Sequence, residues 1–385
     1  GGMASIGGHV SDGMIDYLHW VSNQGGIEYK DPVSGQMEKV AIKVPWEDNQ
    51  YDVSKAISAY KRLKAGGVNA IIAFGSTPGE ACAASASRDK LPYLSWYSYA
   101  SPAGYSPKPQ YYWSPLTCGG DASTALVKWF VKEKWQGTEA PKVGYMAANL
   151  PSWRVLGKPG LMEPYVESLG GKLAGIEFMP LVVTDLSVPI TRLVIDKKAE
   201  CIIFIGTLGQ TVVAAKDIVR LGIDPGKVTM LCNASAWDES LLKSIPREVE
   251  GLYGEVFSVL PTEDVPGMKL VKQVSEWKNR SSEEVNSNYI CGFVGSLVLE
   301  AAVKRALEKK GYESVASSGE DIRQELANFG SLDTGGLMPE VKITHPDVEP
   351  YFVVYNQITE ARGGKLNVVS DWIKVDLIEG AIEME

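Results

Sequence analysis

Helical and strand-like patterns alternate along the chain. In the first unit, 54–75, apolar residues recur at helical spacing from Ala56 to Leu63, and Gly66 follows as a stop signal. This order recurs and predicts strands at 68–75, 91–98, 142–149, 172–179, 199–206 and 227–233. Alternation with helices of about 10–15 residues is typical of an α/β fold with parallel sheets. The strands are continuously apolar, which fits sheets covered on both faces.

The last part of the sequence has a different pattern. Helices are predicted at 288–311 and near 321–329, after which the sequence becomes β-rich. The segments 350–358 and 365–375, separated by the glycine pair 363–364, predict a β-hairpin. The chain therefore does not consist of two simple consecutive domains.

Length and charge narrow the class of protein. A chain of 385 residues suits two domains of ordinary size. With 47 acidic and 38 basic residues the net charge is −9, so we expect no nucleic acid and no anionic membrane as partner. No apolar run approaches the ~20 residues that span a bilayer. The first residues, 1–13, have neither the basic nor the apolar region of a signal peptide.

The ionisable and sulfur-containing residues give no catalytic pattern. The chain has three histidines, and it contains no G-x-S-x-G, no H-E-x-x-H and neither glycine-rich phosphate motif. The five cysteines are scattered without a C-x-x-C pair, and we expect most of them to be small buried residues. They are Cys82, Cys118, Cys201, Cys232 and Cys291. The sequence predicts no enzyme, no cofactor and no metal site.

Four segments, taken in order, carry a family resemblance. They are NQGGI at 23–27, the strand, acidic turn, helix and strand at 42–76, the D-L-S-V-P-I-T-R-L unit within 169–193, and the closing hairpin at 343–358. Together they resemble the type I periplasmic binding proteins, in particular the branched-chain amino acid (Leu/Ile/Val) substrate-binding proteins of ABC transporters. No counterpart of the family's first strand precedes Gly1.

The resemblance implies an architecture and a role. The expected fold has two Rossmann-like lobes with parallel central sheets, joined by a three-strand hinge, with lobe one at 1–116 and 258–337 and lobe two at 117–257 and 338–385. The expected role is that of a periplasmic or surface-tethered solute-binding protein of an ABC importer. Its partners would be a small organic acid or amino acid, bound in the interlobe cleft, and a membrane permease. We expect a monomer.

The resemblance and the ends of the predicted strands indicate ligand-binding residues in lobe one. Ser76 and Thr77 offer hydroxyls beside free helix N-terminal amides, a suitable carboxylate site, although a plain helix cap explains them equally from sequence alone. Backbone groups after the next strand are carried over from the family. The candidates are Ser5 and Ile6 in a glycine-rich loop, Ser76, Thr77, Tyr97, Ser98, Tyr99 and Ala100.

In lobe two the candidates are Trp153, Thr207, Leu208, Ala234 and Ser235. We expect Trp153 to cover the ligand as an aromatic lid, or else to be a half-exposed surface residue. Relatives that bind amino acids often carry an acidic residue where this chain has Ala234 and Ser235. Because a buried ammonium without a counter-charge costs several kcal/mol, the ligand need not be an α-amino acid.

Two further considerations complete the sequence-based prediction. The charged residues Asp238 and Glu239 follow the same loop and are alternative counter-charges for an ammonium group. A ligand-sensing receptor or regulator of the same fold is the alternative to a transport protein. A receptor would continue into a transmembrane helix and a regulator would carry a helix-turn-helix, and neither pattern occurs in this sequence.

Overall fold

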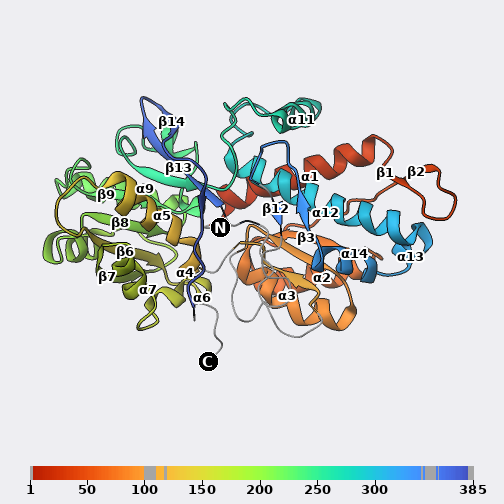
Figure 1. Ribbon diagram of the computed structural model, residues 1–385, viewed down its shortest axis with the longest axis horizontal. Coiled ribbons are helices and arrows are strands. Elements are labelled where there is room, and N and C mark those ends of the chain that lie inside the picture. The colour runs from red at the N-terminus through yellow and green to blue at the C-terminus, as the bar shows by residue number, and fades with distance from the viewer. Residues whose placement is uncertain are drawn as a thin grey trace. The chain divides into compact units, whose positions relative to one another are not determined.

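The computed structural model describes residues 3–98, 110–116, 119–339, 341–342, 353 and 355–379. The chain forms two compact units, each built from separate segments of sequence (Figure 1). Unit 1 contains Ile6–Leu116 and Pro261–Val353, and unit 2 contains Thr117–Leu260 and Val354–Glu385. The last change of unit thus falls at Val353, whereas the sequence analysis placed it near residue 337.

Unit 1 is built on a small parallel sheet of order β3-β4-β5. Its strands are β3 (Ile71–Phe74), β4 (Tyr93–Trp96) and β5 (Tyr112–Trp113), with hairpins β1 (Ile27–Lys30)–β2 (Met37–Val40) and β11 (Ser331–Leu332)–β12 (Val341–Lys342). Its helices are α1 (Ala4–Asn23), α2 (Val53–Ala65), α3 (Ser76–Asp89), α11 (Pro266–Trp277), α12 (Ser287–Lys310), α13 (Tyr312–Ser317) and α14 (Glu320–Ala327). The predicted helices at 54–67, 288–311 and 321–329 are therefore confirmed.

Two helices of unit 1 approach each other so closely that only glycine fits. A Cβ atom on Gly13 of α1 would lie 2.1 Å from the Tyr289 carbonyl oxygen of α12, and one on Gly292 would lie 1.9 Å from the Val10 carbonyl oxygen. The glycines thus lie on both sides of the α1–α12 contact. This contact buries α12 on nearly all sides along its first half, where Tyr289, Ile290 and Phe293 are fully buried.

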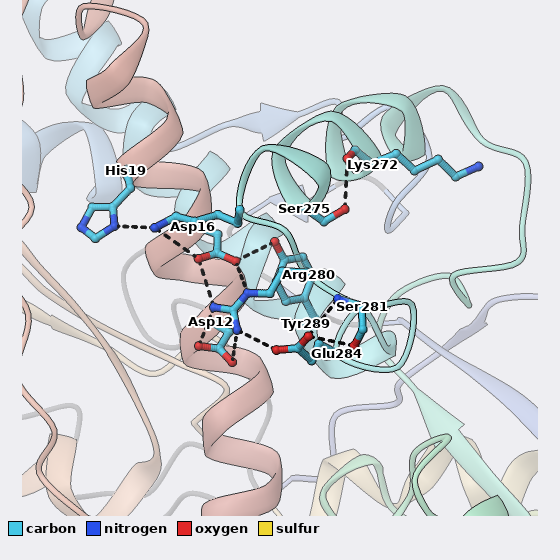
Figure 2. A network of polar contacts seen from close by, with 10 residues as sticks. Asp12, Asp16, His19, Lys272, Ser275, Arg280, Ser281, Glu284 and Tyr289 are labelled. Atoms are coloured by element: carbon cyan, nitrogen blue, oxygen red, sulfur yellow. Dashed lines mark hydrogen bonds and ion pairs between the residues drawn. The ribbon is translucent and has the colours of Figure 1, made fainter.

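A buried ion network holds the same two helices together (Figure 2). The side chain of Asp16 on α1 is 1% exposed, and its carboxylate accepts from Arg280 Nε at 2.8 Å and from the Tyr289 hydroxyl at 3.1 Å. Arg280 also pairs with Asp12 at 2.9 Å and Glu284 at 3.1 Å. These carboxylates raise the pKa of Arg280, whereas burial raises the pKa of Asp12. Arg280 therefore links the α11–α12 connection to α1.

Unit 2 is built on an eight-stranded mixed sheet in which the order β14-β13-β10-β9-β8-β6-β7 is extended by β15 on β13. The parallel strands are β6 (Lys142–Ala148), β7 (Lys172–Met179), β8 (Cys201–Ile205), β9 (Thr229–Cys232) and β10 (Tyr253–Val256). The antiparallel strands are β13 (Tyr355–Arg362), β14 (Lys365–Val368) and β15 (Ile373–Lys374), and the β13–β14 pair confirms the predicted hairpin. In Figure 1 the blue C-terminal strands extend the green sheet.

The helices of unit 2 are short and often irregular. They are α4 (Gly119–Ala122), α5 (Thr124–Trp129), α6 (Pro151–Arg154), α7 (Met162–Ser168), α8 (Ser187–Ile190), α9 (Leu208–Arg220) and α10 (Leu241–Ser244), with 3₁₀ or π turns at 130–134, 155–157, 191–196 and 234–236. The strands β8 and β9 are buried throughout, as expected for a sheet covered on both faces. No helix among the described residues is long and apolar enough to cross a membrane.

We predict that replacing Arg280 with Met lowers the free energy of unfolding by about 3 kcal/mol, because Asp16 would remain buried with only the longer 3.8 Å contact to Lys278 as its ion pair. Arg62→Met is the matched control, since the Arg62 side chain is 62% exposed in its pair with Glu47. The control should change stability by less than about 1 kcal/mol. Urea unfolding of both variants measures the difference in their free energies of unfolding. Equal losses of stability would show that the buried network stabilises the fold no more than the exposed Arg62–Glu47 pair.

Candidate functional site

The strand-to-helix turn after β3 lies at the carboxyl edge of the unit 1 sheet. Gly75 links β3 to α3 with φ +96°, and a Cβ atom there would lie 2.5 Å from the Tyr51 ring. Ser76 is buried in the first turn of α3, and the preceding N-cap residue, Gly75, has no side chain that could cap the helix. The Tyr51 side chain hydrogen-bonds to Thr77, and burial raises the pKa of Tyr51. An aromatic ring thus packs against the turn predicted to bind a carboxylate.

The turn after β4 adds buried hydroxyls beside it. Ser95 Oγ donates to the Gly75 carbonyl oxygen at 2.8 Å, and Ser114 Oγ donates to the Ser98 carbonyl oxygen at 2.9 Å. Tyr97 is buried with φ +54°, a left-handed conformation that a bulky residue adopts only when its surroundings hold it there. Its ring lies 5.9 Å from that of Phe74. Tyr97 and Ser98 are therefore brought next to the Ser76 turn, and Tyr99 and Ala100 lie outside the described residues.

The N-terminal candidates are not in a loop. Helix α1 begins at Ala4, so Ser5 and Ile6 occupy its first turn, and the expectation of a glycine-rich loop was wrong. The Ile6 side chain is fully buried. The glycines of this stretch are compatible with helix because tertiary packing overrides their low helix propensity. Gly7, for example, lies where a Cβ atom would be 2.9 Å from the Phe74 ring.

In unit 2, three candidates are buried at two strand-to-helix turns. Trp153 is buried in the short helix α6, so the alternative of a half-exposed surface residue was wrong. Thr207 is the N-cap of α9 and forms a capping box with Gln210, while Leu208 is buried in the first turn. The Thr207 hydroxyl therefore accepts the Gln210 N–H, a common way to satisfy a helix N-terminus.

Ala234 and Ser235 lie in a 3₁₀ turn directly after β9. Ser235 Oγ donates to the Gly206 carbonyl oxygen at 2.8 Å, and the Gly206 N–H donates to Asn233 Oδ1 at 3.0 Å. These bonds fasten the turn after β9 to the turn after β8. Asp238, which the sequence analysis considered as a counter-charge, is buried, and its Oδ1 accepts the Ser240 N–H at 2.8 Å.

Sequence reasoning missed Glu255, a fully buried carboxyl group near the end of β10. Its Oε1 accepts the Ala234 N–H at 3.2 Å and its Oε2 accepts Asn356 Nδ2 at 2.5 Å. Burial raises the pKa of Glu255 to about 8, while these two neutral donors act in the opposite direction. The signal that could have found it is a single acidic residue inside the otherwise uncharged segment 252–260, LYGEVFSVL.

The cysteines and acidic residues give no metal site within the described parts of the chain. No group of three or more His, Cys, Asp or Glu side chains is placed there to hold a metal ion. Cys82, Cys201, Cys232 and Cys291 are free and buried, which confirms their reading as small core residues. Cys118 lies outside the described residues.

Each α/β unit has buried polar groups after its parallel strands, the edge at which open α/β sheets bind ligands. The family model for periplasmic binding proteins matches residues 1–355, and the chain belongs to this family. Because this family consists of solute-binding proteins that act outside the cytoplasm, the predictions of an extracytoplasmic binding protein and of no enzyme are confirmed at that level. No curated protein sequence matches the chain.

Solved structures share the fold at low sequence identity. The chain is similar to a branched chain amino acid ABC transporter protein from Thermus thermophilus with bound valine (TM-score 0.77, 17% identity, 97% of this chain and 93% of that chain). It is also similar to a solute binding protein from Rhodopseudomonas palustris BisB5 in complex with 3,4-dihydroxy benzoic acid (TM-score 0.70, 17% identity, 99% of this chain and 96% of that chain). A third similar structure is a fatty acid ABC transporter substrate-binding protein from Thermomonospora curvata (TM-score 0.72, 18% identity, 97% of this chain and 90% of that chain). The type I fold class is therefore confirmed.

We predict that Glu255 makes the protein less stable at high pH. The unfolded chain loses this proton near pH 4.5, whereas the folded protein retains it to about pH 8, so stability falls as pH rises between these values. Relative to Glu255→Gln, the wild type should lose on the order of 2–4 kcal/mol between pH 5 and pH 9. Urea unfolding at several pH values measures this, and parallel pH curves for the two proteins would contradict it.

Proposed function

We propose that the protein is the solute-binding component of an ABC importer and binds a small carboxylate-bearing ligand, in the periplasm or tethered at the cell surface. The ligand is an aromatic or aliphatic acid or an amino acid. The protein acts as a monomer and presents its ligand to a membrane permease. The observation that carries this proposal is the α3 N-terminus, a buried strand-to-helix turn that holds Ser76 and packs against the aromatic ring of Tyr51.

The chemistry of this turn suits an acid. The first amides of a helix have no partners within the helix, and the helix dipole favours a negative charge at this end. The glycine at the N-cap, Gly75, has no side chain that could cap this end, although the Tyr51 side chain hydrogen-bonds to Thr77 there. Tyr51, Phe74 and Tyr97 supply the apolar surface that an aliphatic or aromatic body would need. Structural relatives with bound valine and with bound 3,4-dihydroxy benzoic acid support both kinds of body.

The transport role requires two conformations. A ligand that binds one conformation better than the other shifts the population by that difference in affinity. The permease would recognise the closed form. In this proposal the turns of unit 2 that hold Trp153, Thr207, Ala234 and Ser235 are further candidate ligand contacts.

Thermal unfolding tests the ligand class directly. The panel contains aliphatic and aromatic amino acids, simple aromatic and aliphatic carboxylates, and sugars as a control class. A true ligand at a hundred times its Kd should stabilise the protein by about 2.7 kcal/mol and raise its Tm by several degrees. Sugars should have no effect. A Tm raised by sugars but by no acid would show that the carboxylate proposal is wrong.

The α3 turn should be required for that stabilisation. The Ser76→Asp variant places a carboxylate where we expect the ligand's carboxylate. The Pro78→Ala variant is the control, because it leaves the charge of the turn unaltered. Ser76→Asp should weaken acid binding at least tenfold through like-charge repulsion, and Pro78→Ala should stay within about threefold. Calorimetric titration with the best acid from the panel measures both, and an unchanged Kd in Ser76→Asp would place the ligand elsewhere.

A further inference from the structure

The segment that joins β2 to α2, residues 41–52, forms no helix or strand and is fastened to its own unit at two points. Arg62 of α2 donates from Nε to Glu47 Oε1 at 2.8 Å, in an ion pair on the surface. Near its end, the ring of Tyr51 lies so close to Gly75 that a Cβ atom there would be 2.5 Å from the ring. The segment therefore reaches from α2 to the start of α3.

The backbone of this segment is held in an uncommon conformation beside that contact. Gln50 has φ +53° and Tyr51 has φ +57°, a region that residues other than glycine seldom adopt. The Gln50 N–H donates to Asp48 Oδ1 at 2.7 Å, and the Tyr51 N–H donates to Asn49 Oδ1 at 2.8 Å. Such a conformation persists only where the surroundings hold it. The contacts of the Tyr51 side chain are part of what holds it.

Backbone donors are scarce at the start of α3. The Gly75 N–H donates to the Trp96 carbonyl oxygen at 3.4 Å, and Pro78 has no N–H. The Tyr51 side chain hydrogen-bonds to Thr77 at both its side chain and its backbone. A helix N-terminus with an ordinary residue at each position offers more donors than this one. Tyr51 therefore occupies donors that a carboxylate at this turn would need.

A carboxylate is the better partner for the donors of Thr77. A hydrogen bond to an ionised acceptor is about twice as strong as one between neutral groups, and the phenol oxygen of Tyr51 is neutral at pH 7. The displaced ring has apolar surface beside it, because the Tyr51 ring already lies 6.0 Å from that of Phe74, which lies 5.9 Å from that of Tyr97. The hydroxyl can thus leave Thr77 while the ring stays among aromatic neighbours.

We propose that Tyr51 is an internal competitor of the ligand: its hydroxyl holds Thr77 in the ligand-free protein, and the ligand carboxylate binds Thr77 only by displacing it. The ring then turns away from Gly75, and residues 46–52 relax. Since every acid must displace the same hydroxyl, Tyr51 lowers the affinity for all of them and sets the concentration at which the site fills. This inference rests on the proposed function, because it concerns the same turn.

Removing the hydroxyl while keeping the ring should strengthen binding. In Tyr51→Phe the donors of Thr77 have no internal acceptor, so acids should bind about three- to tenfold tighter, the equivalent of one ordinary hydrogen bond. Calorimetric titration of both proteins with leucine, phenylalanine, benzoate and p-hydroxybenzoate measures this. Each acid that binds the wild type should gain by a similar factor.

Tyr60→Phe is the matched control. It makes the same change in the same unit, at a hydroxyl that donates to Asp89 Oδ2 at 3.1 Å on the far side of α2 from the α3 turn in sequence. Because that bond does not involve the α3 turn, the Kd for each acid should change less than about twofold. An equal gain in both variants would show that the effect has nothing to do with Thr77, and the inference would be wrong.

Hydrogen exchange gives a second readout that does not depend on a variant. Ligands usually slow exchange where they bind, but here a saturating acid should speed exchange of the 46–52 amides by about threefold or more, because the Tyr51 contact is lost. In Tyr51→Phe these amides should exchange at nearly the faster rate without acid. Slower exchange of 46–52 in the wild type on binding would show that Tyr51 stays on the turn, and would overturn the inference.

The outcomes separate this inference from the proposed function. If acids bind the wild type and Tyr51→Phe weakens their binding, the hydroxyl donates to the ligand instead of competing with it. An unchanged Kd in Tyr51→Phe would likewise contradict the inference, and in both cases the proposed function stands. If no acid binds either protein, the ligand class and this inference are both wrong.

Discussion

Both units depend on the geometry of the parallel β–α–β crossover. Each strand must be followed by a helix that returns along the sheet, so the carboxyl ends of successive parallel strands meet at one edge. This places Ser76, Ser98 and Tyr97 together in unit 1, and Trp153, Thr207 and Ala234 along one edge in unit 2. The turns there are made of helix N-termini, and their amides need acceptors. The edge is therefore polar although the strands are apolar.

The protein deals with buried charge in two different ways. In unit 1, Arg280 satisfies three carboxylates and fastens α1 to α12, next to glycine contacts that already bring the two backbones together. In unit 2, Glu255 is held by neutral donors only. The first arrangement stabilises one geometry, because removing Arg280 would leave the buried Asp16 without its short ion pair. The second arrangement allows the protonation state of Glu255 to change with its surroundings.

The order of helices and strands could be predicted from sequence because it rests on local periodicity. The β13–β14 hairpin, for example, needs only two β-rich segments and the glycine pair between them. Residues whose role depends on distant partners could not be predicted. Glu255 meets Ala234 and Asn356, which lie 21 and 101 residues away, and nothing in the local pattern indicates those contacts. The start of α1 was misjudged because its glycines, which suggest a loop, are there to pack against Phe74 and α12.

The buried cysteines bear on how such a protein reaches its folded state outside the cytoplasm. In the folded chain, burial raises the pKa of Cys82 to about 11 and of Cys291 to about 12, so their reactive thiolate forms are suppressed at neutral pH. That protection exists only after the core has closed. A newly exported chain presents the same thiols to an oxidising environment before it folds. The rate of core formation therefore competes with the rate of thiol oxidation at these described cysteines.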